Sequence, residues 1–257
     1  MEQTKPLVSV VMPSYNSQAF LLLAVESVRC QTMTDLELII VDDCSTDRTM
    51  ELLAAASQSD PRIKVIENET NIGAALSRNR AFEAARGDYI ALLDSDDLWK
   101  PEKLARQLAL AEETGADIVY CSYEMIDEAG RKRWPDFIVP ESTDLEQMLL
   151  TSVISCSTAL LKAEICKKHV FPQNVYHEDY AYWLSLLQAG YMACGVPDVL
   201  ASYRVRADSR SFNKLRSAAR RWSVYREYLG MPLGKSLKVF GQYAIGGLKK
   251  YRKQNYE

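Results

Sequence analysis

Histidine is scarce in this chain, and cysteine occurs without any spacing typical of a metal site. The two histidines, His169 and His177, are too few for a histidine-rich metal centre. A Ser-His-Asp hydrolase would have to use one of them, and no Gly-x-Ser-x-Gly elbow accompanies them. The six cysteines form no Cys-x-x-Cys pair, so we expect free thiols, mostly small core residues in a reducing compartment.

A long apolar run is also lacking. No stretch approaches the ~18 residues that a membrane-spanning helix needs. The first six residues have neither the basic nor the apolar region of a signal peptide. These absences predict a protein that is made and stays in the cytosol. The 257 residues are 47% hydrophobic and 25% charged, which is typical of a globular protein and excludes a disordered or collagen-like chain.

The charge of the chain is unevenly distributed. Residues 211–257 hold eleven lysines and arginines against two glutamates, a net charge of +9, whereas the first 210 residues carry −12. A basic segment on an acidic body suggests that the segment meets an anionic partner. We do not expect nucleic acid as that partner, because the body is acidic.

Up to about residue 115, short apolar runs alternate with helical patterns. Strands are predicted at residues 7–12, 36–41, 63–66 and 89–93, and helices at 18–31, from 45–47 onward and at 74–86. Pro13 should end the first strand, because proline cannot continue a central strand. This βαβ alternation predicts an α/β fold with a doubly wound, mostly parallel sheet flanked by helices.

The second half of the chain is more mixed. Strands are predicted at residues 117–123, 132–139 and 199–203, an apolar run lies at 155–161, and helices are predicted at 163–168 and from 177–179 to 190. Residues 211–257 predict two amphipathic helices, with a break at 230–234. Their apolar rows are Leu215, Ala218, Trp222, Tyr225, Leu229, and Leu237, Phe240, Ala244, Leu248, Tyr251. These rows allow either packing on the body or a membrane-surface helix attracted to anionic lipid.

Polar residues follow three of the predicted strands, at 13–16, 42–43 and 94–97. Such residues often cap helices, but parallel strands bring their carboxyl ends to one rim, where ligands bind. Several carboxylates at one rim repel each other unless a cation neutralises them. Oxygen ligands without histidine or cysteine favour Mg²⁺ or Mn²⁺, which commonly bridge substrate phosphates. No Gly-x-Gly-x-x-Gly or Walker loop is present, so neither a dinucleotide site nor a P-loop is expected.

Five stretches together resemble the family 2 glycosyltransferases, which have the GT-A fold. They are Val8–Asn16, Ile40–Asp47, Asn71–Asn79, Tyr89–Asp97 and His177–Trp183. They follow the family's order and spacing over roughly residues 6–205. Within the family, the chain is similar to bacterial enzymes that build surface polysaccharide, such as teichuronic-acid, O-antigen or capsule transferases.

The resemblance implies a GT-A domain over residues 1–210, with a nucleotide-binding part at 1–115 and an acceptor-binding part at 116–210. Residues 211–257 would be a basic amphipathic helical extension. An oligomer is compatible with the sequence.

The resemblance also implies a donor site for a nucleotide sugar, expected to be a UDP-sugar. Pro13 and Tyr15 would bracket the base, with Tyr15 offering an aromatic face for stacking. Asp42 or Asp43 would accept a hydrogen bond from the uracil N–H, and spacing favours Asp43. Arg78 would help to neutralise the diphosphate.

The segment Asp94-Ser95-Asp96 fits the family's Asp-x-Asp motif, which implies Mn²⁺ or Mg²⁺ as a cofactor. Asp96 would bind the metal directly. Asp94 would contact the ribose or the coordination shell of the metal, and Ser95 belongs to the same donor-binding segment. The metal would stabilise the charge that develops on the leaving nucleoside diphosphate.

Asp179 matches the acidic residue of the family's Glu-Asp motif, the implied catalytic base. Inversion by a single displacement requires one carboxylate that removes the acceptor hydroxyl proton. Glu178 and His177 would lie on the acceptor side. Trp99 could offer a face for stacking on a sugar, whereas packing is the expectation for Trp183.

Processive members of the family carry Gln-x-x-Arg-Trp after the base, and here residues 218–222 have alanine in place of glutamine. This departure favours the addition of one sugar per encounter. Arg204 and Arg206 follow the base, where they could reach the diphosphate.

These features predict an inverting, metal-dependent, non-processive glycosyltransferase at the inner face of the cell membrane. Its acceptor would be a hydroxyl of a growing lipid-linked glycan on the cell surface. Two alternatives remain. A non-catalytic subunit could bind the nucleotide sugar, or a sugar-1-phosphate nucleotidyltransferase could share the layered sheet. The latter should carry a glycine-rich basic loop after the first strand, and residues 13–16 are not such a loop.

Overall fold

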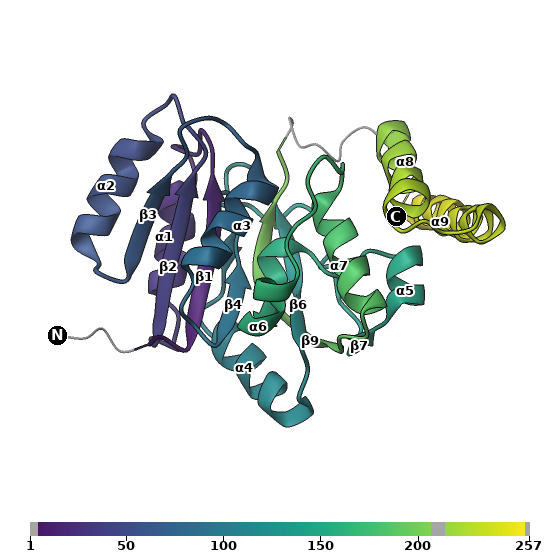
Figure 1. Cartoon of the computed structure of the whole chain (residues 1–257), viewed down its shortest axis with the longest axis horizontal. Helices are drawn as coiled ribbons and strands as arrows, with labels where there is room; N and C mark the ends of the chain where they lie inside the picture. Colours follow the sequence, from purple (N-terminus) through teal and green to yellow (C-terminus); the bar gives the residue numbers. More distant parts are fainter. Residues whose placement is uncertain (1–4, 207–213, 255–257) are drawn as a thin grey trace.

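The computed structural model describes the backbone of residues 5–206 and 214–254, with side chains at 5–206 and 218–244 (Figure 1). One mixed sheet runs through these residues in the order β3-β2-β1-β4-β8-β6-β9-β5, and β7 pairs with β9 outside this path. The strands are β1 (Val8–Ser14), β2 (Leu36–Asp42), β3 (Ile63–Glu67), β4 (Tyr89–Leu92), β5 (Leu98–Trp99), β6 (Ile118–Ile126), β7 (Ser142–Thr143), β8 (Leu160–Lys162) and β9 (Ala193–Arg204). Strands β1 to β4 are parallel to one another, which confirms the predicted doubly wound half.

Helices cover both faces of this sheet (Figure 1). They are α1 (Leu21–Arg29), α2 (Thr49–Ser59), α3 (Ala74–Ala84), α4 (Lys103–Thr114), α5 (Leu145–Leu150), α6 (Ala163–Lys168) and α7 (Glu178–Gln188). Val11 of β1 faces one core together with Phe82 of α3, and Val10 faces the other with Leu21 of α1. Because both faces are covered, every residue of β1 and β2 is buried, and the strands therefore read as continuous apolar runs.

The end of β1 and the start of α2 differ from the sequence prediction. Strand β1 continues through Pro13 to Ser14. Beyond Val11 it pairs only with β2, so it is an edge there, where proline is tolerated. Helix α2 begins at Thr49 rather than at 45–47, because Asp47 folds back and its Oδ1 accepts a hydrogen bond from the backbone N–H of Thr49 at 2.9 Å.

The predicted return strand at 132–139 is also wrong, since only the isolated bridges Tyr123–Phe137 and Ile126–Lys132 form. The apolar run at 155–161 divides into a short 3₁₀ turn, η1 (Cys156–Thr158), and β8. The predicted last strand, at 199–203, is the end of the longer β9.

The C-terminal helices are α8 (Lys214–Ser223), the π-helical turn η2 (Val224–Tyr228) and α9 (Leu233–Gln254). They pack against α5 and α7 at the end of the molecule opposite α2 (Figure 1). Arg221 carries this contact, because its buried guanidinium donates to the carbonyl of Leu149 at 3.0 Å and to the hydroxyl of Tyr180 at 2.8 Å. The predicted helices are confirmed, whereas the predicted boundary at 210/211 lies outside the described residues.

Within residues 5–206 and 214–254, no helix combines the length and the apolar character needed to cross a bilayer.

Candidate active site

A cleft of about 570 Å³ opens beyond the carboxyl ends of β1, β2 and β4, the position expected for ligands in such a sheet. The N-terminal ends of α3 and α7 and the end of β9 complete its walls. The cleft brings together ten of the twelve predicted site residues: Pro13, Tyr15, Asp43, Arg78, Asp94, Ser95, Asp96, His177, Glu178 and Asp179.

Asp42 and Trp99 do not line the cleft. Asp42 is fully buried, and its carboxylate accepts hydrogen bonds from the backbone N–H and the hydroxyl of Ser45 at 2.8 and 2.6 Å. Trp99 is 4% exposed; its indole N–H donates to the carbonyl of Ser157 at 2.6 Å, and the ammonium of Lys103 lies 4.0 Å from its ring centre. Trp99 is therefore a core residue, which corrects the prediction that it faces the acceptor. Trp183 is fully buried as well.

Asp43 joins the end of β2 to the start of α3. Its carboxylate accepts hydrogen bonds from the backbone N–H groups of Ile72 and Gly73 at 2.8 and 2.7 Å, and from the amide of Asn68 at 2.8 Å. Gly73 has φ +87°, a conformation that glycine adopts without strain. Tyr15, which is 49% exposed, also lines the cleft, and the residue before it, Ser14, accepts a hydrogen bond from the backbone N–H of Asp43 at 2.8 Å. The cleft thus contains an exposed aromatic ring and a carboxylate held in place.

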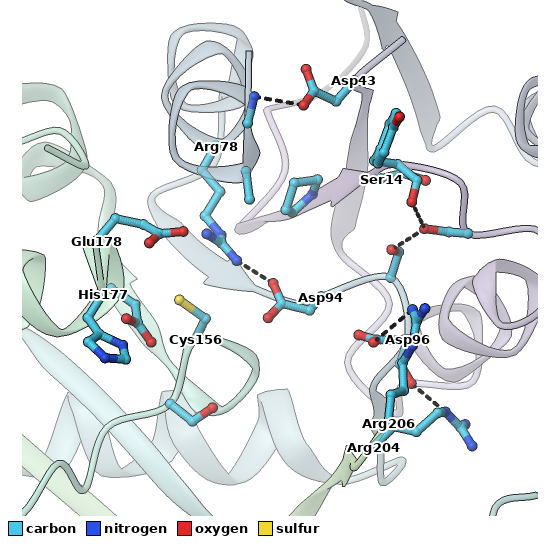
Figure 2. Close-up of a pocket in the computed structure, with 18 of the residues that line it drawn as sticks. Ser14, Asp43, Arg78, Asp94, Asp96, Cys156, His177, Glu178, Arg204 and Arg206 are labelled. Atoms are coloured by element: carbon cyan, nitrogen blue, oxygen red, sulfur yellow. Dashed lines mark hydrogen bonds and ion pairs between the residues drawn. The ribbon is translucent and has the colours of Figure 1, made fainter. Parts of the chain in front are cut away.

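Arg78 lies in the middle of the cleft wall, between the corner of Asp43 and the carboxylates that follow β4 (Figure 2). Its guanidinium is 5% exposed, pairs with Asp94, and lies 5.2 Å from the ring centre of Phe171. Arg78 is therefore buried, although arginine side chains are mostly exposed in folded proteins.

The segment after β4 places Asp96 at the opposite end of the cleft from α7 (Figure 2). The side chain of Asp96 is 29% exposed and lies 3.6 Å from the guanidinium Nη1 of Arg206. Burial, together with the charge of Asp94, raises the pKa of Asp96. The hydroxyls of Ser95 and Ser17 share a hydrogen bond of 2.7 Å, so Ser95 ties this segment to the loop after β1.

Asp97 fixes the Asp94–Asp96 segment through hydrogen bonds to Ser157 and Arg204, a role that the sequence analysis missed. It is 1% exposed and accepts hydrogen bonds from the hydroxyl of Ser157 at 2.6 Å and the backbone N–H of Arg204 at 2.8 Å. The Ser157 hydroxyl also accepts from the backbone N–H of Asp94 at 3.1 Å, and Arg204 Nε donates to the carbonyl of Asp96 at 2.8 Å. A buried carboxylate thus joins three distant segments.

The N-terminus of α7 carries the acidic pair on the other side of the cleft. His177 precedes the helix with φ +61°, a region that non-glycine residues adopt rarely and often at functional sites. Asp179 Oδ1 accepts from the backbone N–H of Tyr180 at 2.7 Å. Burial, and then the charge of Glu178, raises the pKa of Asp179. Burial lowers the pKa of His177.

The cleft also contains residues for which the sequence gave no signal. Tyr176 is 65% exposed, and the guanidinium of Arg220, from the basic C-terminal segment, lies 4.3 Å from its ring centre.

Three polar atoms that belong to cleft-lining residues are buried without a hydrogen-bond partner among the described residues: Ser14 Oγ, Arg78 Nε and Arg204 Nη2. Because buried polar atoms are nearly always paired, these three indicate a site built for a polar ligand.

The carboxylates after β4 fit a hard divalent cation. The described residues contain no group of three or more His, Cys, Asp or Glu side chains that could hold a metal by themselves. Mg²⁺ and similar ions, however, commonly take one or two carboxylates and complete their shell with substrate phosphates and water. Asp96, with Asp94 beside it, supplies such a set of oxygen ligands.

Curated proteins similar to this chain are glycosyltransferases. TuaG of Bacillus subtilis, named for teichuronic acid biosynthesis, is 39% identical over 97% of this chain and 99% of its own length. WfgD of Escherichia coli is 34% identical over 95% of each chain. Its name describes a glucosyltransferase that uses UDP-Glc and α-D-GlcNAc-diphosphoundecaprenol.

Solved structures share the fold at lower identity. S. aureus TarS in complex with UDP-GlcNAc superposes with a TM-score of 0.71 at 21% identity, over 92% of this chain and 71% of that chain. The Pyrobaculum calidifontis mannosyltransferase in complex with GDP-Man and Mn²⁺ gives a TM-score of 0.68 at 18% identity, over 94% of this chain and 70% of that chain. These likenesses confirm the predicted GT-A arrangement of sheet and helices. The model of the family described as glycosyl transferase family 2 matches residues 9–170, and the chain belongs to that family.

Proposed function

We propose that this protein is an inverting, metal-dependent, non-processive hexosyltransferase. It moves a sugar from a UDP-sugar to a hydroxyl of a lipid-linked glycan destined for the cell surface. One observation carries the proposal: the partly buried base candidate Asp179 and the metal-ligand candidate Asp96 line the same cleft, and Arg78 lies between Glu178 and Asp94 (Figure 2). The substrates named for WfgD, and the UDP-GlcNAc bound to TarS, support this choice of donor and acceptor.

On the donor side, the aromatic face of Tyr15 and the ring of Pro13 bracket the base. Asp43 accepts a hydrogen bond from the uracil N–H. The backbone N–H groups that already donate to Asp43 hold its carboxylate in a fixed position. We assign this task to residues 1–115 and the binding of the acceptor to residues 116–210.

Around the diphosphate, Asp96 would hold Mn²⁺ or Mg²⁺, and Asp94 would contact the ribose or the shell of the metal. A metal bound there would stabilise the negative charge of the leaving diphosphate. Arg78 and Arg204 each have one buried N–H without a protein partner, and we assign these groups to the phosphates. Arg206, now paired with Asp96, lies within reach of the same charges.

On the acceptor side, Asp179 removes the proton of the attacking hydroxyl as the C1–oxygen bond forms and the bond to the diphosphate breaks. Its raised pKa suits this task, because a stronger base accepts the proton more readily. Glu178 and His177 contact the acceptor beside it.

The first test is thermal stabilisation by a nucleotide panel, with Mn²⁺ or with a chelator. A ligand that binds the native state at one hundred times its Kd adds about 2.7 kcal/mol to the free energy of unfolding. We expect a shift with UDP plus Mn²⁺ that the chelator abolishes and that ATP and NAD do not give. No shift with any uridine nucleotide would contradict the donor assignment.

Product analysis of the same protein distinguishes the proposed transferase from a non-catalytic subunit and from a nucleotidyltransferase. A non-catalytic subunit would bind the UDP-sugar without transfer or hydrolysis. A nucleotidyltransferase would instead consume a nucleoside triphosphate and a sugar 1-phosphate, releasing diphosphate.

Replacing Glu178 with glutamine should move the acidic limb of the pH profile of kcat/KM to lower pH. A general base works only when deprotonated, so the rate falls as the pH drops through its pKa. Burial is the larger cause that raises the pKa of Asp179, and the charge of Glu178 is the next. Removing the charge of Glu178 lowers the pKa of Asp179, so the rate is lost at a lower pH. Glu164→Gln, which changes a side chain of α6 that is 67% exposed, is the control, and an unmoved limb in Glu178→Gln would contradict the assignment.

A further inference from the structure

The described side chains of α9, at residues 233–244, include one row that packs on the body and one apolar row that is exposed. Val239 is 8% exposed and packs in the main core, one turn after the fully buried Ser236. Leu233 and Leu237, also one turn apart, are 55% and 57% exposed. A helix that only packed on the body would bury its apolar row, so the second row is available for another contact.

Basic residues lie on the same turns of α9 as this exposed row. Lys235 and Lys238 are also exposed, but further round the helix, because residues one or two positions apart do not share a helix face. We call Leu233, Lys235, Leu237 and Lys238 the α9 ridge. The ridge belongs to the segment 211–257, whose net charge is +9, on a body of −12. Exposed leucines on one face of a helix, with lysines on the rest of its exposed surface, are typical of helices that lie in a bilayer interface. The charge favours an anionic lipid surface over a second copy of the same basic helix.

The helices that carry the ridge also reach the cleft. Arg220 of α8 lines the cleft, and the buried Arg221 fixes the same helix to α5 and α7. α8 and α9 lie together at one end of the molecule (Figure 1). A bilayer in contact with α9 would therefore lie at the acceptor end of the protein rather than at the end that carries α2.

We propose that the α9 ridge is a membrane-contact surface, with Leu233 and Leu237 inserted at the acyl boundary and Lys235 and Lys238 among anionic headgroups. In its purpose, the supply of a lipid-linked acceptor, this inference rests on the proposed function. The binding itself does not depend on sugar transfer. The C-terminal segment would then have one face that packs on the body and another that binds lipid.

The test is sedimentation of the full chain with vesicles. Vesicles of phosphatidylglycerol and phosphatidylethanolamine should bind the protein, and vesicles of phosphatidylcholine should not. The double variant Leu233→Asp, Leu237→Asp should lower the partition coefficient by about tenfold or more, because two apolar side chains no longer enter the bilayer. Lys235→Gln, Lys238→Gln should lower it by roughly tenfold at low salt and less at high salt.

The matched control is Leu22→Asp, Leu23→Asp on α1, where two leucines are 48% and 55% exposed. It should bind vesicles like the parent. Equal loss in this control, unchanged binding of the ridge variants, or equal binding to both kinds of vesicle would overturn the proposal. A dimeric parent that the ridge variants convert to monomer would assign the ridge to a second copy instead.

Stabilisation by UDP plus Mn²⁺ separates this proposal from the proposed function. The ridge variants should keep it in full. Vesicle binding that persists in a protein without any uridine-nucleotide binding would contradict the proposed UDP-sugar donor and leave the membrane surface in place.

Discussion

The variant Asp179→Asn should bind UDP nearly as tightly as the parent and turn over roughly 10²–10⁴-fold more slowly. Asparagine has the shape of aspartate, and its Oδ1 can still accept the hydrogen bond that Tyr180 N–H donates at 2.7 Å. It cannot accept the proton of an attacking hydroxyl, however. Since this proton moves only as the new bond forms, kcat and kcat/KM should fall together.

Folding should not suffer in Asp179→Asn, because burial disfavours the charge of this carboxyl, as its raised pKa indicates. A melting temperature at or above that of the parent would show that the lost turnover is chemical. Asp198→Asn, which removes an exposed carboxylate paired with Arg106, is the control and should retain full turnover. Full turnover in Asp179→Asn itself would exclude Asp179 as the base.

The first half of the fold, up to about residue 115, could be predicted because its signals are local. Strands buried on both faces read as uninterrupted apolar runs, and the polar residues that follow them lie at one rim for topological reasons. The errors lie where a segment distant in sequence determines the local structure. Pro13 remains inside β1 because β4 stops pairing at Val11, and no local pattern shows where a neighbouring strand ends.

The motifs predicted residues that line one cleft. Asp43, Asp96 and Asp179 are distant in sequence, yet all three line it. Asp97 was recognised only as a polar residue after a strand, because its partners, Ser157 and Arg204, lie 60 and 107 residues away. Trp99 shows the opposite error: an aromatic residue close to a motif lies in the core. Spacing cannot distinguish these cases, since burial depends on the whole packing.

The variant Asp96→Ala should abolish the metal-dependent part of UDP binding. Its thermal shift with UDP and Mn²⁺ should fall to that of the parent in chelator, and turnover should fall roughly 10³-fold, because the leaving diphosphate loses its counter-charge. Asp96 is the sharper probe of the two carboxylates. The loss of Asp94 would leave the buried guanidinium of Arg78 without its ion pair, and such a charge destabilises the fold.

Asp96→Ala should melt close to the parent, because the side chain that it removes is 29% exposed and its ion pair with Arg206 spans 3.6 Å. Asp88→Ala, at the exposed pair with Lys5, is the control and should bind UDP and Mn²⁺ like the parent. If Asp96→Ala kept a chelator-sensitive shift of the parental size, the metal would have to bind elsewhere. Unchanged binding with lost turnover would instead mean that Asp96 acts on the reacting groups rather than on the affinity of the donor.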